Sequence, residues 1–135
     1  MNKHINELVK EAFEISKQHG FHDTDSDIEK GSEQFHLIAA QRLALLHSEI
    51  SEALEADRKN RFADLKSFEN ADNSTDEKFN HNFKQYIKDT FEDELADTMI
   101  RIFDICGWLN IDIERHIDLK MKYNSLREHK NGKQY

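Results

Sequence analysis

The chain contains no proline, and only four glycines interrupt its 135 residues. Proline and glycine are the residues that most often end a helix or permit a tight turn. The stretch between Gly31 and Gly107 contains neither residue, whereas a β fold with many turns would need several. The sequence therefore predicts an all-α fold, a bundle of about four to five helices. Its length fits a single domain over residues 1–135 that buries its own core.

Apolar residues recur at helical spacing in several segments, which predicts helices over about 3–19, 33–59, 84–107 and 111–128. We expect Gly20 to end the first helix, Ser32 to cap the second and Gly107 to end the third. Residues 60–82 are polar and rich in asparagine, and are expected to form a flexible insertion with a short helix at 61–69. The basic tail from Glu128 is expected to be mobile unless a ligand or a partner subunit holds it.

The net negative charge of the chain argues against some classes of binding partner. A formal net charge of -8 repels the backbone of DNA and RNA, so nucleic acid is not an expected partner. Residues 1–7 lack the apolar core of a signal peptide, and no apolar run is long enough to span a bilayer. We expect a soluble cytoplasmic protein with no membrane partner. The single cysteine, Cys106, lies in an apolar helical stretch and is interpreted as a packed thiol.

Two acidic residues lie on the apolar side of the predicted helix 33–59. With about 100° per residue, the apolar residues Ile38, Leu45, Leu46, Ala53 and Ala56 fall within about 60° of Glu49. Glu52 follows three residues later, at the edge of the same stripe. Residues three apart on a helix are neighbours, so these two carboxylates share one patch.

The predicted helix 84–107 repeats this pattern. Glu94 lies at the centre of its apolar face, Asp97 lies at the edge, and Asp104 lies two turns beyond Asp97 as a possible outer or fifth member. Buried carboxylates that repel one another need a cation nearby. Oxygen ligands suit magnesium, with manganese as an alternative, and magnesium commonly bridges to phosphates. A single ExxE pair arises often by chance, as Glu52 and Glu55 illustrate, but two such pairs on two apolar faces form a more specific signal.

Three segments of the chain resemble a known family. Residues 45–56 and 91–102, which carry the ExxE and ExxD pairs, are similar to the two acidic motifs of the MazG-like, all-α nucleoside triphosphate pyrophosphohydrolases. Residues 120–127, followed by His129, Gly132 and Lys133, resemble the C-terminal segment of that family. Residues 19–23 resemble its aromatic loop. The resemblance covers most of residues 8–135.

The resemblance implies an enzyme that hydrolyses a (d)NTP to the (d)NMP and pyrophosphate in nucleotide-pool housekeeping, as a homodimer or homotetramer. It also implies a role for each of several residues. The implied magnesium ligands are Glu49, Glu52, Glu94 and Asp97, and Glu49 or Glu52 would orient or deprotonate the attacking water. The residues that would approach the phosphates or the sugar are Lys120, Asn124 and Arg127. The residues that would lie near the base are Phe21 and His22. The two acidic motifs are farther apart here than is usual in the family, which leaves the substrate preference open.

Other interpretations stay open at this point. A phosphoribosyl-ATP pyrophosphatase has a similar fold and metal site. A di-iron bundle would need an ExxH pair on each of two helices, and the chain offers only Glu33 to His36, away from the acidic pairs. A non-catalytic dimerisation or adaptor module would show no rise in melting temperature with magnesium. Lys and Arg near the C-terminus of a helix also complement its dipole, and Phe21 with His22 equally fits a plug over the end of a bundle.

Overall fold

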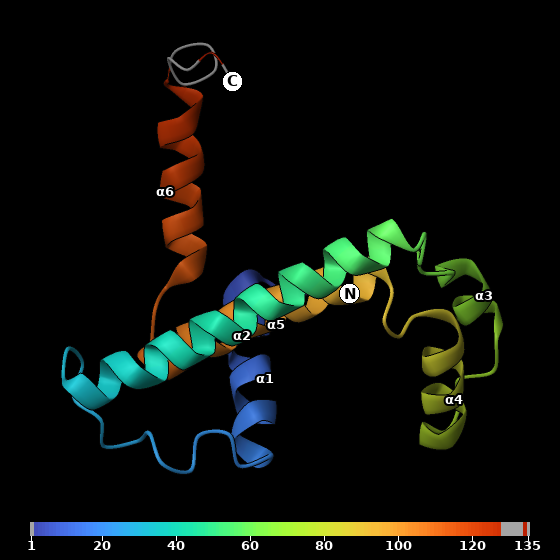
Figure 1. The fold of residues 1–135 in the computed structure, drawn as a ribbon, viewed down its shortest axis with the longest axis horizontal. Coiled ribbons are helices and arrows are strands. Elements are labelled where there is room, and N and C mark those ends of the chain that lie inside the picture. The colour runs from blue at the N-terminus through green and yellow to red at the C-terminus, as the bar shows by residue number, and fades with distance from the viewer. Residues whose placement is uncertain (1, 128–133, 135) are drawn as a thin grey trace. The chain divides into compact units, whose positions relative to one another are not determined.

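The computed structural model describes residues 2–127 and 134. Within this part of the chain all regular structure is helical and no strand is present, which confirms the predicted all-α class (Figure 1). The predicted mobile tail lies almost entirely outside the described residues, as do His129, Gly132 and Lys133. The described residues form six helices instead of four to five: α1 (Ile5–Gln18), α2 (Glu33–Arg58), α3 (Leu65–Asn70), α4 (Asp76–Tyr86), α5 (Phe91–Leu109) and α6 (Ile113–Ser125).

The helices belong to two compact units. The terminal unit comprises the residues up to Thr24 and those from Phe103 onward, and the central unit comprises Asp25–Ile102. Helix α5 supplies residues to both. Across the described residues, none of the helices has an apolar stretch of the length that a bilayer crossing requires.

In the terminal unit, α1 is joined to the start of α6 by polar contacts. The backbone N–H of Ile5 donates to the Glu114 carboxylate at 3.0 Å, and the Asn6 side-chain amide donates to the Asp112 carboxylate at 2.8 Å. At the other end of α1, Gly20 has a φ of 84°, and the N–H of Phe21 donates to the carbonyl of Ser16 at 3.2 Å. A left-handed residue after the last turn is a common helix stop, so the expected role of Gly20 is confirmed.

Helix α5 ends within two residues of the predicted stop, but Gly107 itself does not end it, because α5 continues to Leu109. The helix ends instead at Asn110, which has a φ of 52°, and the N–H of Ile111 donates back to the carbonyl of Cys106 at 2.9 Å. Gly107 lies against α1, where a Cβ added to it would meet the Cβ of Phe13 at 2.4 Å. Its lack of a side chain therefore permits a close approach of two helices.

We expect Gly107→Ala to lower the free energy of unfolding by about 1–3 kcal/mol, because the added methyl group overpacks the contact with Phe13. Without this contact the same substitution would stabilise a helix interior by about 1 kcal/mol, so the sign of the change is informative. Urea denaturation measures it. An increase in stability would contradict the contact.

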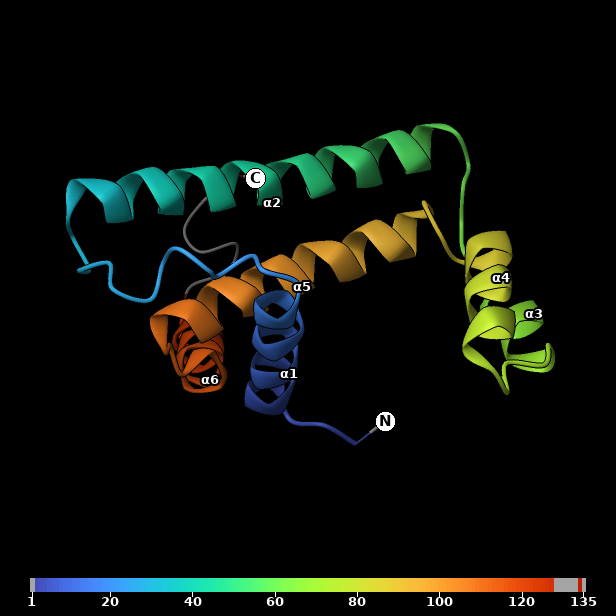
Figure 2. The same ribbon diagram turned by 90° about the horizontal axis from the view of Figure 1, so that it is seen from below.

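In the central unit, α2 and α5 run antiparallel side by side (Figures 1 and 2). The hydroxyl of Ser32 accepts from the N–H of Phe35 at 3.2 Å, which confirms Ser32 as the cap of α2. At the far end, Asn60 adopts a φ of 53°, and the N–H of Arg61 donates to the carbonyl of Ala56 at 2.9 Å. The predicted end of this helix at residue 59 is therefore correct to within one residue.

The prediction of a flexible insertion at 60–82 is wrong for most of its second half, where α4 begins at Asp76. The short helix expected at 61–69 exists as α3, displaced by a few residues. Helices α3 and α4 pack through the rings of Phe68, Phe79 and Phe83. The two ends of the segment that contains α3 and α4 (the α3–α4 segment, residues 64–86) lie together, because the N–H of Asp64 donates to the carbonyl of Tyr86 at 2.9 Å.

The single helix predicted from residue 84 is in fact two helices. The helical structure is interrupted between Tyr86 and Phe91, where Asp89 has a φ of 62°. Thr90 then starts α5, because its hydroxyl accepts from the N–H of Asp93 at 3.3 Å and its carbonyl accepts from the N–H of Glu94 at 3.0 Å. This start places Glu94 in the first turn of α5.

Candidate metal centre

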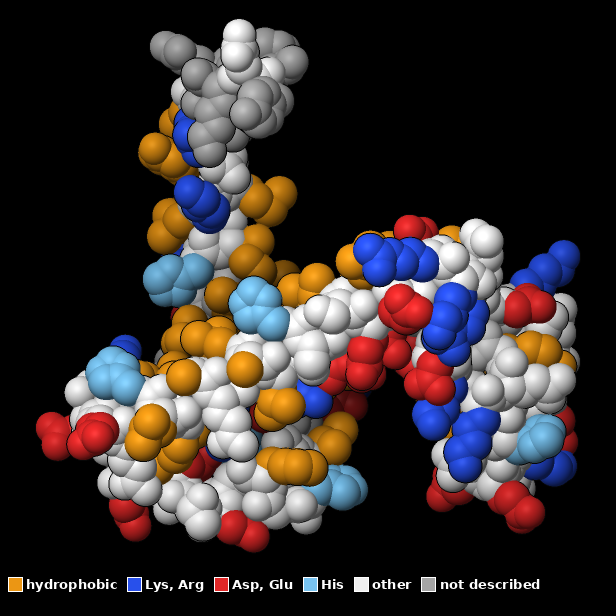
Figure 3. Space-filling view, in the orientation of Figure 1, with side chains coloured by type: hydrophobic (Ala, Val, Ile, Leu, Met, Phe, Trp, Pro, Cys, Tyr) orange, Lys and Arg blue, Asp and Glu red, His pale blue; other side chains and the backbone are white. Residues whose placement is uncertain are grey.

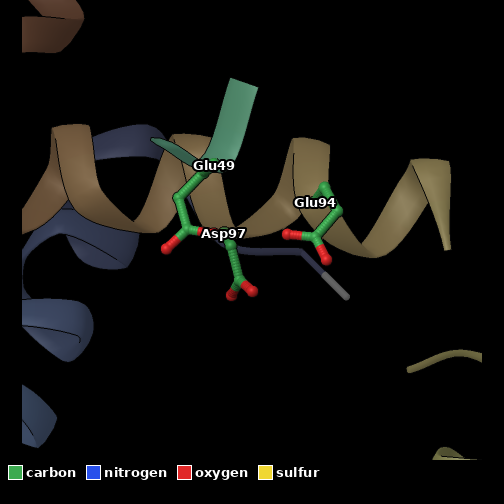
Figure 4. A group of neighbouring side chains, drawn as sticks. All are labelled: Glu49, Glu94 and Asp97. Atoms are coloured by element: carbon green, nitrogen blue, oxygen red, sulfur yellow. The ribbon is translucent and has the colours of Figure 1, made fainter. Parts of the chain in front are cut away.

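Three of the four predicted acidic residues lie together in the central unit. Glu49 of α2 and Glu94 and Asp97 of α5 each offer a carboxylate oxygen, and these oxygens lie within 4.8 Å of one another. Figure 4 shows the three side chains reaching a common region from the two helices. Oxygen atoms at this separation are close enough to share one cation.

The burial of these residues follows from their position on the helices. Glu49 is 8% exposed and shares a buried face with Ala53 and Ala56, as the helical spacing predicts. Glu94 is 5% exposed, and Asp97 is half-buried. The apolar stripe of α2 is narrower than expected, because Leu45 is 41% exposed.

Glu94 has the most unfavourable environment of the group. Its Oε2 atom is buried and receives no hydrogen bond from any described residue. Burial raises the pKa of Glu94 to about 7, and interaction with Glu52 and the negative charge of Asp97 add to the rise. A carboxylate in these surroundings is stabilised by a cation.

Glu52 lies apart from the other three. It is exposed and does not belong to the group of close carboxylate oxygens. It nevertheless lies near enough for its carboxylate to raise the pKa of Glu94. Burial also raises the pKa of Asp97, with further contributions from the charges of Asp93 and Glu49, whereas Arg101 acts in the opposite direction.

Arg101 is a functional candidate that the sequence reasoning missed. Its Nε atom donates to Oε1 of Glu49 at 2.5 Å, which joins α5 to α2 within the carboxylate group. The signal was present in the sequence, because Arg101 follows Asp97 by one helical turn and therefore lies on the same face of α5.

A second acidic group, Asp89, Asp93 and Glu94, lies at the start of α5. Here the carboxylate of Asp93 accepts from the backbone N–H of Asp89 at 2.9 Å. Acidic residues in the first turn of a helix satisfy unpaired N–H groups and complement the dipole. This group is therefore explained by the start of the helix.

Asp104 is not a fifth member of the carboxylate group, as the sequence had suggested. It lies in the terminal unit, where its Oδ1 is 2.7 Å from Nε2 of His22 and its Oδ2 accepts from the Ser16 hydroxyl at 3.2 Å. His22 is buried and its ring packs on Phe13 at 4.6 Å between centroids. The neighbouring Phe21 is 74% exposed.

The basic residues expected to approach the phosphates lie on or just beyond α6, also in the terminal unit. Lys120, Asn124 and Arg127 are all exposed. The cations of Lys120 and Arg127 lie over the ring of Tyr123, at 4.8 Å and 5.6 Å from its centroid. Their role toward a substrate stays a prediction.

The carboxylate group of the central unit fits a hard divalent cation. All its donors are oxygens, one of them is buried without a partner, and the pKa of Glu94 lies well above its usual range. Comparison of the chain with protein-family models, with curated proteins and with solved structures gives no match.

Proposed function

We propose that this protein is a magnesium-dependent nucleoside triphosphate pyrophosphohydrolase whose metal site comprises Glu49, Glu94 and Asp97, with the carboxylate of Glu52 beside it. The observation that carries the proposal is the unpartnered, buried Oε2 of Glu94 beside two further carboxylates. A fold selected for stability alone would place an apolar side chain there, since burying an unpaired acid is costly. The retained acid supports a binding role.

The kind of ligand follows from the donor atoms. Zinc and copper favour nitrogen and sulfur donors, whereas this group offers only carboxylates, which suit magnesium or manganese. When bound, magnesium supplies positive charge that stabilises phosphate oxygens and the leaving pyrophosphate. The nucleotide as substrate is supported by the resemblance of residues 45–56 and 91–102 to the acidic motifs of the MazG-like family.

The residues of the site have distinct tasks in this proposal. Glu94, Glu49 and Asp97 hold the cation from two helices. Water attacks a phosphorus of the triphosphate, the new P–O bond forms as the bond to the pyrophosphate leaving group breaks, and a carboxylate receives the proton of the water. Of the two carboxylates proposed as this base, Glu52 is exposed to solvent, whereas Glu49 is held by Arg101.

The proposal includes an oligomer, a homodimer or a homotetramer. Several large apolar side chains of α2 and α5 are at least 44% exposed, among them Leu43, Ile50, Leu54, Leu95 and Met99. Figure 3 also shows apolar side chains along α6, where Leu119, Met121 and Tyr123 are exposed, as is Leu126 just after the helix. Exposed apolar residues in this number are typical of surfaces that a partner covers.

The test is pyrophosphate release from a panel of canonical and damaged NTPs and dNTPs, with magnesium, with manganese and with chelator. Glu49→Ala is expected to lower the rate at least about 100-fold, since it removes a proposed metal ligand. Glu55→Ala is the matched control, because Glu55 lies on the same helix but pairs with Lys59 at 3.1 Å. Equal rates for wild type and Glu49→Ala would refute the site.

The same panel of nucleotides, extended by phosphoribosyl-ATP, distinguishes the proposed function from the two alternative functions. Selective hydrolysis of phosphoribosyl-ATP would assign the protein to that related activity. An adaptor module would release no pyrophosphate from any nucleotide, and its melting temperature would not rise with magnesium.

A further inference from the structure

We infer that Arg101 acts as a counter-cation of the carboxylate group. Its positive charge neutralises part of the negative charge of the group, and it thereby lowers the affinity of the site for a divalent cation. This inference rests on the proposed metal site. Its basis is the contact between Nε of Arg101 and Oε1 of Glu49 at 2.5 Å.

The position of Arg101 within the group supports this role. The Glu49 side chain is 11% exposed, so its negative charge is poorly solvated and needs a partner. Arg101 also follows Asp97 by one helical turn on the same face of α5, so its positive charge lies near a second member of the group. One guanidinium therefore offsets charge on both helices.

The guanidinium does not give up its charge when a cation binds. Arginine stays protonated in proteins, so a divalent cation held by Glu49, Glu94 and Asp97 would lie close to a fixed positive charge. At about 6 Å in surroundings of water-like dielectric constant, the repulsion between charges of +2 and +1 corresponds to roughly a tenfold change in a binding constant. The Arg101 side chain is 39% exposed, so solvent screens its charge, and the water-like value gives the smallest effect expected.

A purely structural role for Arg101 makes a different prediction. If the residue only ties α5 to α2, its loss lowers the stability of the metal-free and the magnesium-bound protein by the same amount. A counter-cation instead stabilises the metal-free protein and opposes metal binding. The difference between the two melting temperatures distinguishes these roles.

The experiment compares wild type, Arg101→Gln and Arg101→Lys in chelator and over a magnesium chloride series, by melting temperature and by calorimetric titration with magnesium alone. Arg101→Gln is expected to melt lower than wild type in chelator and to bind magnesium about tenfold more tightly. Arg101→Lys keeps the charge and should bind magnesium as wild type does. Arg115→Gln is the matched control, because Arg115 pairs with Asp118 on the exposed side of α6.

Each outcome bears on the inference. Equal magnesium affinity in Arg101→Gln and wild type, or weaker binding in the variant, overturns it and leaves the proposed metal site standing. Absence of magnesium binding in all variants refutes the metal site and the inference together. Tighter binding in Arg101→Gln without pyrophosphate release from any nucleotide supports the inference and refutes the proposed activity.

Discussion

Glu94→Gln is expected to abolish nucleotide hydrolysis and, in the same protein, to raise the stability of the metal-free state at pH 8. The two effects have one cause. Glu94 is 5% exposed, and its Oε2 atom receives no hydrogen bond from a described residue. Its negative charge is therefore costly without a cation and necessary with one.

The expected magnitudes differ. Loss of a metal ligand should lower the rate of pyrophosphate release at least about 100-fold, since even residues that only support ligands cost about 10- to 100-fold. The neutral amide has nearly the same shape and donates to neighbouring carboxylates instead of repelling them. We expect a gain of about 1–2 kcal/mol in the free energy of unfolding of the metal-free protein.

Urea denaturation in chelator and pyrophosphate release with magnesium measure the two effects on the same preparations. Glu55→Gln is the control, because the Glu55 side chain is 47% exposed and pairs with Lys59 on the surface of α2. A Glu94→Gln variant that is less stable than wild type in chelator, or that retains full activity, would contradict the proposed role of Glu94.

The second large effect is a loss of stability of the metal-free protein as pH rises from about 4.5 to about 7. Glu94 has its ordinary pKa of 4.5 in the unfolded chain and a pKa of about 7 in the folded protein. The folded state binds the proton of Glu94 more tightly than the unfolded state does. The stabilisation from this proton is therefore complete below the pKa of the unfolded chain and is lost as the pH rises through the pKa of the folded protein. The shift corresponds to about 3 kcal/mol.

Because other groups titrate in this range, the informative quantity is the difference between wild type and Glu94→Gln. Their free energies of unfolding, measured in chelator at a series of pH values from 4.5 to 8, should diverge as pH rises. Asp97, whose pKa is also raised by burial, adds a contribution of the same sign. Saturating magnesium should reduce the divergence or reverse it. Parallel pH profiles for the two proteins would refute the raised pKa.

The helical spacing of the sequence correctly predicted that Glu49 and Glu94 are buried. Burial of Glu49 and Glu94 follows from their places near the centres of apolar faces, whereas Leu45 on the same face of α2 is exposed. The spacing did not separate Glu52, at the edge of the stripe, from the buried residues. It also missed the contact between Arg101 and Glu49, because the periodicity of one helix does not reveal which residue of another helix lies opposite.

Most helix ends were predicted to within a few residues, but the break before α5 was not. Asn110 ends α5 in the left-handed conformation where Gly107 had been expected to do so, Asn60 adopts it after α2, and Asp89 adopts it in the break before α5. Asparagine and aspartate tolerate this conformation more readily than other side chains, although most of them do not adopt it. Gly107 lies inside α5, because tertiary contact with Phe13 determines its role.

The two ends of the α3–α4 segment lie together, and this affects how well the protein should tolerate insertions and deletions in that segment. The hydrogen bond from Asp64 to Tyr86 closes the segment, and a second bond from the N–H of Phe91 to the carbonyl of Arg61 fixes the chain where α5 begins. The chain between the ends of α2 and α5 is therefore closed by contacts within residues 61–64 and 86–91. We expect segments of different length and sequence to be tolerated between Asp64 and Tyr86, because these closing contacts lie outside the replaced residues.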